Sequence, residues 1–390
     1  MRAVAMKHGT LELKEMPEPR VGPGQLLVEP IAAGVCGGDL NALTMTDEFL
    51  SASRRSDMKT FLFDPDRDLV FGHEFTSRVL EVGAGVADYA PGDVLLNLPY
   101  VVDDNGVTHC VGYATEFPGA LAERVVVQAP GQLKIPDRVS PFLPAVVDPL
   151  ATGLNGVVRS QIGPPSGALV TGCGPVGMGA VWELARRGIT PLVASDPSPQ
   201  RRAMAAEFGA QVVVDPAVDD PVEAWLDLAP TGTRLYVYEA AGKPGLLNSL
   251  LAKLPHFTRV TVVGACMTDD VISPIIGIYK NVTIEFCMGA GPDTEYQFAS
   301  TFEHIVEGRL PAERLVTGYA GLEGVHEVFD ALRPGNYHDI DHMKILVRHD
   351  IDGPGIHPPG IAPHSSRSDE AKGLGDCSDL RPMRAGEADQ

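Results

Sequence analysis

The chain has 390 residues, of which 44% are hydrophobic and 21% are charged. This composition excludes a mainly disordered chain, and the length favours two domains. The 51 acidic and 31 basic side chains give a formal net charge of −20. Because so acidic a surface repels phosphate groups, we expect neither nucleic acid nor an anionic membrane as a partner. A dinucleotide is not excluded, since the N-terminus of a helix can hold a pyrophosphate locally.

The lack of recognisable targeting signals and the spacing of the cysteines bear on the cellular compartment. No apolar run reaches the ~18 residues of a membrane helix, and the N-terminal segment lacks the apolar stretch of a secretory signal. No CxxC pair occurs among the six cysteines, which are Cys36, Cys110, Cys173, Cys266, Cys287 and Cys377. We therefore expect a cytoplasmic protein with reduced cysteines that serve as metal ligands or core residues.

Four stretches of the chain differ in pattern. Residues 1–150 are rich in Val, Gly and Pro, which predicts an irregular β-rich domain, and a polar segment, Thr44–Asp68, interrupts it. Residues 151–289 alternate strand-like and helix-like segments, the pattern of βαβ units in an α/β fold with a parallel sheet. Residues 290–350 carry helical patterns and a closing strand, and residues 351–390 predict a Gly/Pro-rich tail. The strands expected in the parallel sheet are Ala168–Thr171, Pro191–Ser195, Gln211–Val214, Leu235–Tyr238 and Arg259–Val263.

A glycine-rich turn follows the first of these strands. Gly172, Gly174 and Gly177 form the pattern G-x-G-x-x-G, and a helix-like stretch comes next. The first glycine makes the bend, the second lets the backbone approach a pyrophosphate, and the third lets the helix pack on the strand. We expect the backbone of Gly174, Pro175 and Val176 to face the pyrophosphate of a dinucleotide.

The choice of dinucleotide depends on the end of the next predicted strand. Asp196 stands there, where a carboxylate binds a ribose 2′-hydroxyl and repels a 2′-phosphate, so NAD(H) is favoured over NADP(H). Arg201 and Arg202 follow closely. These two cations keep NADP(H) open as an alternative, because either could bind a 2′-phosphate.

A second set of residues has the chemistry of metal ligands. Cys36 in GVCGGDL offers a thiolate, and His73 and Glu74 in FGHEF offer an imidazole and a carboxylate. Soft sulfur with borderline nitrogen and one oxygen suits Zn²⁺. A cysteine between glycines, or an isolated His-Glu pair, is more often structural. The combination with a dinucleotide turn is what favours a metal site.

With these motifs the chain resembles the zinc-dependent medium-chain dehydrogenase/reductase superfamily, of the alcohol dehydrogenase type. The resemblance extends from residue 1 to about 348 and is carried by GVCGGDL, GHEF, VGAGV, PGDVL, VDPLATGLNGV, VTGCGPVG, YVYEAAG and VTVVGA. It implies a GroES-like catalytic domain in 1–150, a Rossmann NAD-binding domain in 151–289 and a return to the catalytic domain in 290–350. It also implies a homodimer or homotetramer, because edge strands of the Rossmann sheets often pair in this family.

The resemblance assigns roles to individual residues. Cys36 and His73 match zinc ligands, Glu74 an exchangeable carboxylate ligand, and Asp148 the third ligand of the family. Asp39 matches the acid that orients the zinc-bound histidine. The cofactor contacts so implied are Gly172, Gly174, Pro175, Val176, Gly177, Asp196, Arg201, Val263, Gly264 and Ala265.

Three departures from the family pattern bear on mechanism. Cys110 stands alone in the lobe where relatives with a structural zinc carry four cysteines, so we expect one zinc and no structural one. Gly38 and Asn41 replace the Ser/Thr and His of the usual proton relay, so that water, Thr152 or the substrate must move the proton. Gly38 should also enlarge the cleft. Together with the segment Thr44–Asp68, this predicts a substrate larger than ethanol.

The sequence therefore predicts a zinc-dependent NAD(P) alcohol dehydrogenase or carbonyl reductase with a small-molecule substrate. Zinc would act as a Lewis acid on the alcohol or carbonyl oxygen, and the nicotinamide would exchange the hydride. Two alternatives stay open. One is an enzyme of the same fold redirected to lyase, isomerase or cyclase chemistry, which the missing relay supports, and the other is a non-catalytic nucleotide-binding descendant. The joint presence of Cys36, His73, Asp39 and the glycine turn favours the dehydrogenase.

Overall fold

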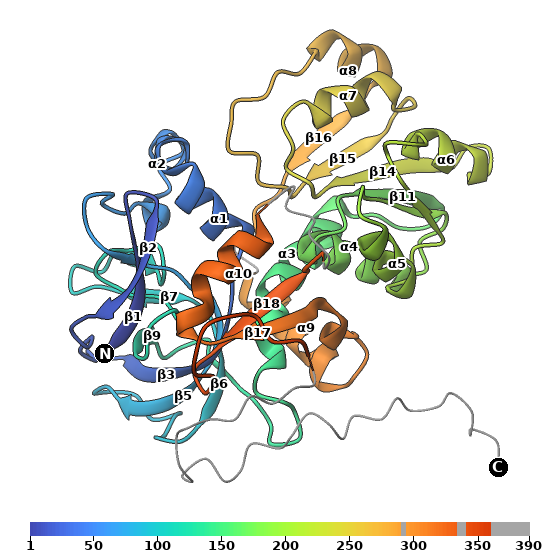
Figure 1. Ribbon diagram of the computed structural model, residues 1–390. Coiled ribbons are helices and arrows are strands. Elements are labelled where there is room, and N and C mark those ends of the chain that lie inside the picture. Colours follow the sequence, from blue (N-terminus) through green and yellow to red (C-terminus); the bar gives the residue numbers. More distant parts are fainter. Residues whose placement is uncertain (290–293, 334–340, 360–390) are drawn as a thin grey trace, which may run out of the picture.

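The computed structural model of the chain describes residues 1–289, 294–333 and 341–359. Within these ranges a β-rich domain and a parallel-sheet domain lie next to each other, with helix α3 (Val147–Ser160) between them (Figure 1). Most of the predicted tail, including Cys377, lies outside the described residues. None of the described helices combines the length and the apolar character needed to cross a bilayer.

The β-rich domain is built on a seven-stranded sheet of order β10-β6-β5-β3-β18-β17, in which β9 also pairs with β3. Along β3 buried and partly exposed side chains alternate, as expected for a strand with one face in the core. The strands of this sheet are β3 (Gln25–Gly34), β5 (Glu74–Val82), β6 (Val94–Asn97), β9 (Val125–Gln128), β10 (Leu133–Lys134), β17 (Val316–Ala320) and β18 (Lys344–Arg348). Two small sheets complete it: β2-β1-β4, formed by β1 (Arg2–Lys7), β2 (Thr10–Glu15) and β4 (Leu69–Val70), and β7-β8, formed by β7 (Tyr100–Val102) and β8 (Thr108–Cys110).

The polar segment Thr44–Asp68 folds mainly as helix. It follows α1 (Gly37–Thr44) and contains α2 (Thr46–Arg55) and a 3₁₀ turn, Lys59–Phe61. Helix α2 is amphipathic and buries Phe49 and Leu50 against the β-rich domain. The segment therefore packs against the core of the β-rich domain.

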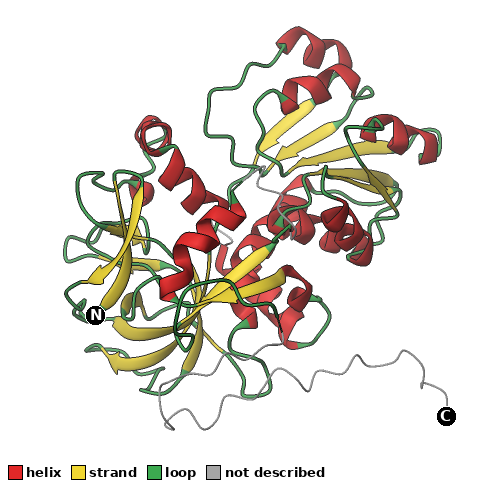
Figure 2. Cartoon of the chain, viewed as in Figure 1, coloured by secondary structure: helices red, strands yellow, loops and turns green. Residues whose placement is uncertain are grey.

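The second domain contains a six-stranded parallel sheet of order β13-β12-β11-β14-β15-β16. This order and the helices on both faces of the sheet are those of a doubly wound fold (Figure 2). Along β11, Ala168 and Val170 enter the core shared with α3 and α4, whereas Leu169 enters the core on the other face. The strands are β11 (Ser166–Thr171), β12 (Leu192–Ser195), β13 (Val212–Val214), β14 (Arg234–Glu239), β15 (Arg259–Val262) and β16 (Thr283–Phe286), and the helices are α4 (Pro175–Arg186), α5 (Pro199–Glu207), α6 (Pro221–Leu228), α7 (Leu246–Lys253) and α8 (Pro274–Lys280). The predicted fold class, a β-rich domain with a doubly wound parallel sheet, is confirmed.

After β16 the chain returns to the β-rich domain through α9 (Thr294–Val306), β17, α10 (Val325–Leu332) and β18. Strand β18 pairs antiparallel with β3, with Leu346 opposite Gly34. Figure 1 shows β18 and α10 crossing the middle of the molecule. This pairing brings the first residue of β18, Lys344, to the end of β3, where the candidate metal ligands lie.

Candidate metal centre and dinucleotide site

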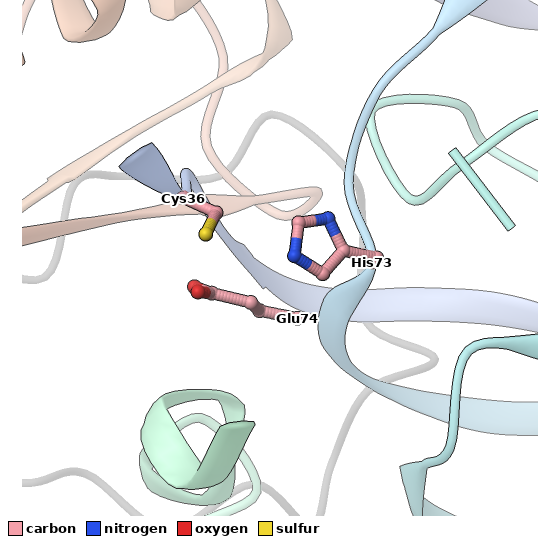
Figure 3. A group of neighbouring side chains, drawn as sticks. All are labelled: Cys36, His73 and Glu74. Atoms are coloured by element: carbon pink, nitrogen blue, oxygen red, sulfur yellow. The ribbon is translucent and has the colours of Figure 1, made fainter. Parts of the chain in front are cut away.

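Three of the predicted metal ligands come together. Ligand atoms of Cys36, His73 and Glu74 all lie within 4.8 Å of one another. Figure 3 shows the sulfur, the imidazole and the carboxylate gathered around a common space. Cys36 follows the end of β3 and Glu74 begins β5, and these two strands pair antiparallel. Sheet pairing thus unites residues that are far apart in the sequence.

The sequence CGGD fixes the sulfur at the N-terminus of α1. The Cys36 sulfur accepts a hydrogen bond from the Gly38 amide at 3.4 Å, and Asp39 Oδ2 accepts one from the Cys36 amide at 2.9 Å. This reciprocal pair is a capping box with cysteine as the N-cap. The second oxygen of Asp39, Oδ1, lies 3.4 Å from His73 Nδ1, although neither atom meets hydrogen-bond geometry. The buried Asp39 carboxylate therefore faces the imidazole.

Glu74 is anchored through one oxygen only. Lys344 Nζ donates to Glu74 Oε2 at 2.5 Å and to the Val35 carbonyl at 2.9 Å, and both charged side chains are buried. Glu74 Oε1 is buried without a hydrogen-bond partner. Gly34, opposite Glu74 in the sheet, leaves room for this arrangement, because a Cβ there would collide with Oε2. An unpartnered carboxylate oxygen beside a thiolate and an imidazole fits a bound cation.

The charges at the cluster are strongly coupled. Burial and the Glu74 carboxylate raise the pKa of the Cys36 thiol. Burial lowers the pKa of His73, but interactions with Asp39 and Cys36 together outweigh it and raise that pKa well above its usual value. For Lys344, too, burial lowers the pKa, but the negative charges of Glu74, Cys36 and Asp39 together outweigh it, so the pKa rises. A metal that binds here must displace protons from Cys36 and His73.

Asp148 lies on α3 beside the cluster, and Thr152 lies one turn further along the same helix. Asp148 is not in the set of ligand atoms within 4.8 Å of one another. Burial raises the pKa of its carboxyl to about 6, while the charges of His73 and Lys344 act to lower it, so Asp148 shares the electrostatic environment of the cluster. The Thr152 hydroxyl donates to the Asp148 carbonyl at 3.1 Å, a bond within the helix.

The expectation that Gly38 enlarges the cleft is wrong. A Cβ at Gly38 would lie 2.6 Å from the Tyr113 hydroxyl, so this side chain fills the space that the glycine leaves. Tyr113 is buried, and its ring centroid lies 5.1 Å from that of His73. Burial and the neighbouring Asp39 and Cys36 charges raise the pKa of Tyr113, which keeps its hydroxyl protonated.

Sequence reasoning missed both Tyr113 and Lys344 as members of this site. The sequence predicts Lys344 on the closing strand, but the local pattern does not show that this strand pairs with β3. Tyr113 follows Cys110 by three residues and has no motif around it. The missing side chain at Gly38 leaves a space, but no signal in the sequence identifies Tyr113 as the residue that fills it.

The glycine turn has the predicted strand–turn–helix geometry. Gly172 follows β11 with φ +89°, and a Cβ there would lie 2.7 Å from the Ala241 amide. Gly174 caps α4, which begins at Pro175, and a Cβ at Gly177 would collide with the Gly172 carbonyl. A Cβ added at Gly174 would have its nearest neighbouring atom 4.0 Å away, so the space in front of this backbone is open.

The residues that bear on cofactor choice surround this turn. Asp196 follows β12 and is buried, with Oδ2 accepting from the Cys173 amide at 2.8 Å and Oδ1 from the Ser198 amide at 2.9 Å. Its carboxylate therefore lies against the glycine turn. Arg201 makes a two-pronged ion pair with Asp341, at 3.0 and 3.1 Å.

The second arginine is also engaged. Arg202 donates to the Asp196 carbonyl at 2.8 Å and pairs with the Asp215 carboxylate at 3.1 Å. Both guanidinium groups are thus held by the protein. The third guanidinium nitrogen of Arg201, Nη1, is the atom nearest to a Cβ added at Gly174, at 4.0 Å.

The segment Val263–Ala265 lies at the carboxyl edge of the same sheet. The amides of Val263 and Gly264 both donate to the Glu239 carbonyl at 2.8 Å. The Glu239 side chain is buried and accepts from the amides of Ala241 and Gly242. In doubly wound sheets, ligands bind outside this edge. Val263, Gly264 and Ala265 therefore lie on the same edge as the glycine turn.

Comparison with known proteins gives matches in both domains. Residues 22–137 match the family described as alcohol dehydrogenase GroES-like domain, and residues 175–304 match the family described as zinc-binding dehydrogenase. The chain is 27% identical over 338 residues to L-threonine 3-dehydrogenase of Thermococcus kodakarensis, covering 83% of this chain and 92% of that protein. It is 28% identical over 352 residues to (R,R)-butanediol dehydrogenase of Bacillus subtilis, covering 87% of this chain and 96% of that protein.

The structures agree with the sequence matches. The crystal structure of 2R,3R-butanediol dehydrogenase from Bacillus subtilis superimposes with a TM-score of 0.71 at 25% identity. The superposition covers 89% of this chain and 99% of that one. The similarity therefore spans both domains and their connection.

Proposed function

We propose that this chain transfers a hydride between NAD(H) and a small alcohol or carbonyl substrate. The proposal starts from its family, because the chain belongs to the zinc-dependent medium-chain dehydrogenase/reductase superfamily of the alcohol dehydrogenase type. The observation that carries the proposal is the convergence of Cys36, His73 and Glu74, with Glu74 Oε1 buried and unpartnered. Members of this family are oxidoreductases that use zinc and a nicotinamide cofactor. The two matched domains supply a place for each.

The residues present fit one zinc ion. Cys36, His73 and Glu74 Oε1 would hold it, and Asp148 is a nearby carboxylate that can complete or exchange with this set. When bound, the metal would supply Lewis-acid polarisation of the substrate oxygen. A structural zinc is not part of the proposal, because Cys110 has no cysteine neighbours in its lobe.

The surrounding side chains fix these ligands in place. Lys344 binds Glu74 Oε2 and so directs Oε1 toward the cluster. Its ammonium also offsets the cost of burying the Glu74 carboxylate. Asp39 faces His73 Nδ1, where it sets the orientation of the imidazole and leaves the other ring nitrogen for the metal.

For the cofactor we propose NAD(H). The backbone at Gly174, Pro175 and Val176 opens the N-terminus of α4 toward the pyrophosphate, and Asp196 beside it would bind the adenosine ribose. The position of Asp196 against the glycine turn supports this choice, because its carboxylate would repel a 2′-phosphate. Changing Asp196 to Ala should relax discrimination against NADP(H).

For the substrate we propose a secondary alcohol with a polar group on the neighbouring carbon. Butanediol and threonine, the substrates named for two relatives, share that feature. Such a molecule is larger than ethanol. The non-oxidative alternative depended on the relay groups missing at Gly38 and Asn41, and it is weakened because the Tyr113 hydroxyl lies at the first of these places.

A homodimer or homotetramer is part of the proposal. Strand β16 is an edge of the parallel sheet, and apolar side chains on it and on α8 are exposed, among them Phe286 (70%), Tyr279 (72%) and Ile278 (67%). An exposed edge with an apolar patch marks an interface between protein copies. We place the protein in the cytoplasm, which the free state of its described cysteines supports.

The proposal is tested by following NADH absorbance with a panel of vicinal diols, β-hydroxy amino acids, sugar alcohols and simple alcohols. Each substrate is assayed with NAD and with NADP, before and after the metal is removed with a chelator and restored with zinc. We expect turnover that prefers NAD and that zinc restores. A tenfold preference for NADPH would overturn the cofactor assignment, and turnover that survives complete loss of metal would overturn the metal assignment.

A further inference from the structure

The space in front of Gly38 is taken by a side chain from another part of the chain. A Cβ at position 38 would lie 2.6 Å from the Tyr113 hydroxyl and 3.8 Å from the Cys36 sulfur. The phenol oxygen therefore points to the place where the side chain of residue 38 would begin, beside a candidate metal ligand. An alanine or serine at position 38 and the tyrosine cannot both occupy this space without a shift.

The segment Thr44–Asp68 holds the Tyr113 ring in this position. Phe49 of α2 stacks on it with centroids 5.5 Å apart and an interplanar angle of 17°. Phe61, from the 3₁₀ turn, lies against it with centroids 5.1 Å apart. Phe71, before β5, meets its edge at 6.2 Å. Because aromatic rings surround it, the tyrosine has little freedom to withdraw from Gly38.

We propose that the Tyr113 hydroxyl takes the place of the hydroxyl expected at position 38 and hydrogen-bonds the substrate oxygen at the Cys36–His73–Glu74 cluster. A phenol O–H both donates and accepts a hydrogen bond, as a serine hydroxyl does. The absent side chain at Gly38 and the segment Thr44–Asp68 then serve the same arrangement. The glycine makes room for the hydroxyl, and the aromatic side chains of the segment hold the ring that carries it. This proposal rests on the proposed dehydrogenase function.

The test compares three variants. Tyr113→Phe removes the hydroxyl and keeps the ring packing, Gly38→Ser forces two hydroxyls into one space, and the double variant moves the hydroxyl from residue 113 to residue 38. The matched control is Tyr238→Phe, which removes a buried hydroxyl bonded to Ser160 in the other domain. Each protein is loaded with zinc for kinetics and with Co²⁺ for spectroscopy.

We expect Tyr113→Phe to lower kcat/KM per bound zinc by about 10²-fold, the usual contribution of a positioned proton-transfer group. Gly38→Ser should lower the melting temperature and activity, and the double variant should recover at least about tenfold over Tyr113→Phe. In the Co²⁺ protein with NAD bound, the visible spectrum of Tyr113→Phe should match that of the wild type. Its response to (2R,3R)-butane-2,3-diol should need about tenfold more diol, the effect of one lost hydrogen bond. Tyr238→Phe should behave like the wild type.

Two outcomes would overturn the proposal. If Tyr113→Phe keeps the wild-type kcat/KM per zinc and the wild-type diol titration, the hydroxyl only fills space, and the dehydrogenase function stands without it. If Tyr113→Phe instead changes the Co²⁺ spectrum before diol is added, the hydroxyl supports the metal ligands rather than the substrate. A wild type that binds metal but oxidises nothing with either cofactor would overturn the proposed function and this inference together.

Discussion

The glycine turn between β11 and α4 and the cluster around Cys36 differ in which part of the chain supplies their polar groups. At the turn, the amides and the bends come from one continuous stretch, Gly172–Gly177, and one further side chain, Asp196, lies against it. At the cluster, every candidate metal ligand is a side chain, and the side chains come from the turn after β3, the start of β5, the start of β18 and the segment after β8.

This difference has a physical cause. A pyrophosphate spreads its charge over several oxygens, so the amides at one helix N-terminus suffice to hold it. A cation such as zinc needs a few strong ligands directed at one point, and here these ligands meet only because β3 pairs with β5. A substitution at the turn should therefore affect mainly that segment, whereas a substitution at the cluster should also affect the other segments that supply side chains to it.

The largest expected effect is the loss of a metal ligand. Cys36→Ala should lose stoichiometric zinc and lower kcat/KM by at least about 10³-fold, because the thiolate and the Lewis acid disappear together. Zinc per chain, measured by mass spectrometry, checks this before any kinetics. The matched control is Cys287→Ala, a buried cysteine of the other domain, which should keep its zinc. Full zinc content in Cys36→Ala would contradict the assignment.

Acid should weaken metal binding steeply. The pKa values of Cys36 and His73 are both raised, so protons compete with the metal up to a higher pH than for free side chains. Below those pKa values the affinity for zinc should rise with pH, by up to about 10²-fold per unit for two displaced protons. Competition titrations with a chromogenic chelator across a pH series give the slope. A flat profile between about pH 5 and 8 would show that these two groups are not the ligands.

Removing Lys344 should leave the Glu74 carboxylate buried without its cation. For Lys344→Met we expect the metal-free protein to lose about 3–5 kcal/mol of stability, the usual cost of breaking a buried ion pair on one side. Added zinc should recover more stability in this variant than in the wild type, because the metal can satisfy Glu74. Chemical denaturation with and without zinc measures both quantities. The control, Lys134→Met, breaks an exposed pair with Asp93 and should cost less than about 1 kcal/mol.

At the glycine turn two neighbouring substitutions should separate fold from cofactor. Gly177→Ala places a Cβ against the Gly172 carbonyl and should destabilise the protein by about 1–3 kcal/mol. Gly174→Ala meets only open space and should cost no more than about 1 kcal/mol at this N-cap, yet raise the Kd for NADH about tenfold by blocking the approach of the pyrophosphate. Fluorescence titration with NADH and thermal denaturation distinguish the two. Equal NADH affinity in Gly174→Ala and the wild type would contradict this placement of the pyrophosphate.

The same contrast explains what could be predicted from the sequence. Local patterns in the sequence were enough to predict the strand before Gly172, the helix after Gly174 and the acid at Asp196, because each pattern has one physical interpretation. Cys36, His73 and Glu74 were recognised as donors, but that they converge follows from the pairing of β3 with β5. Tyr113 was missed and the role of Gly38 misread, because a glycine's empty space says nothing about which distant side chain fills it.

The central claim is that one metal ion is held by one thiolate, one imidazole and a carboxylate at the Cys36–His73–Glu74 cluster. X-ray absorption at the zinc edge of the purified protein measures this coordination directly. We predict one zinc per chain with a single sulfur at about 2.3 Å and nitrogen or oxygen neighbours at about 2.0–2.2 Å. A zinc without sulfur, or one with a shell of several sulfurs, would contradict the account.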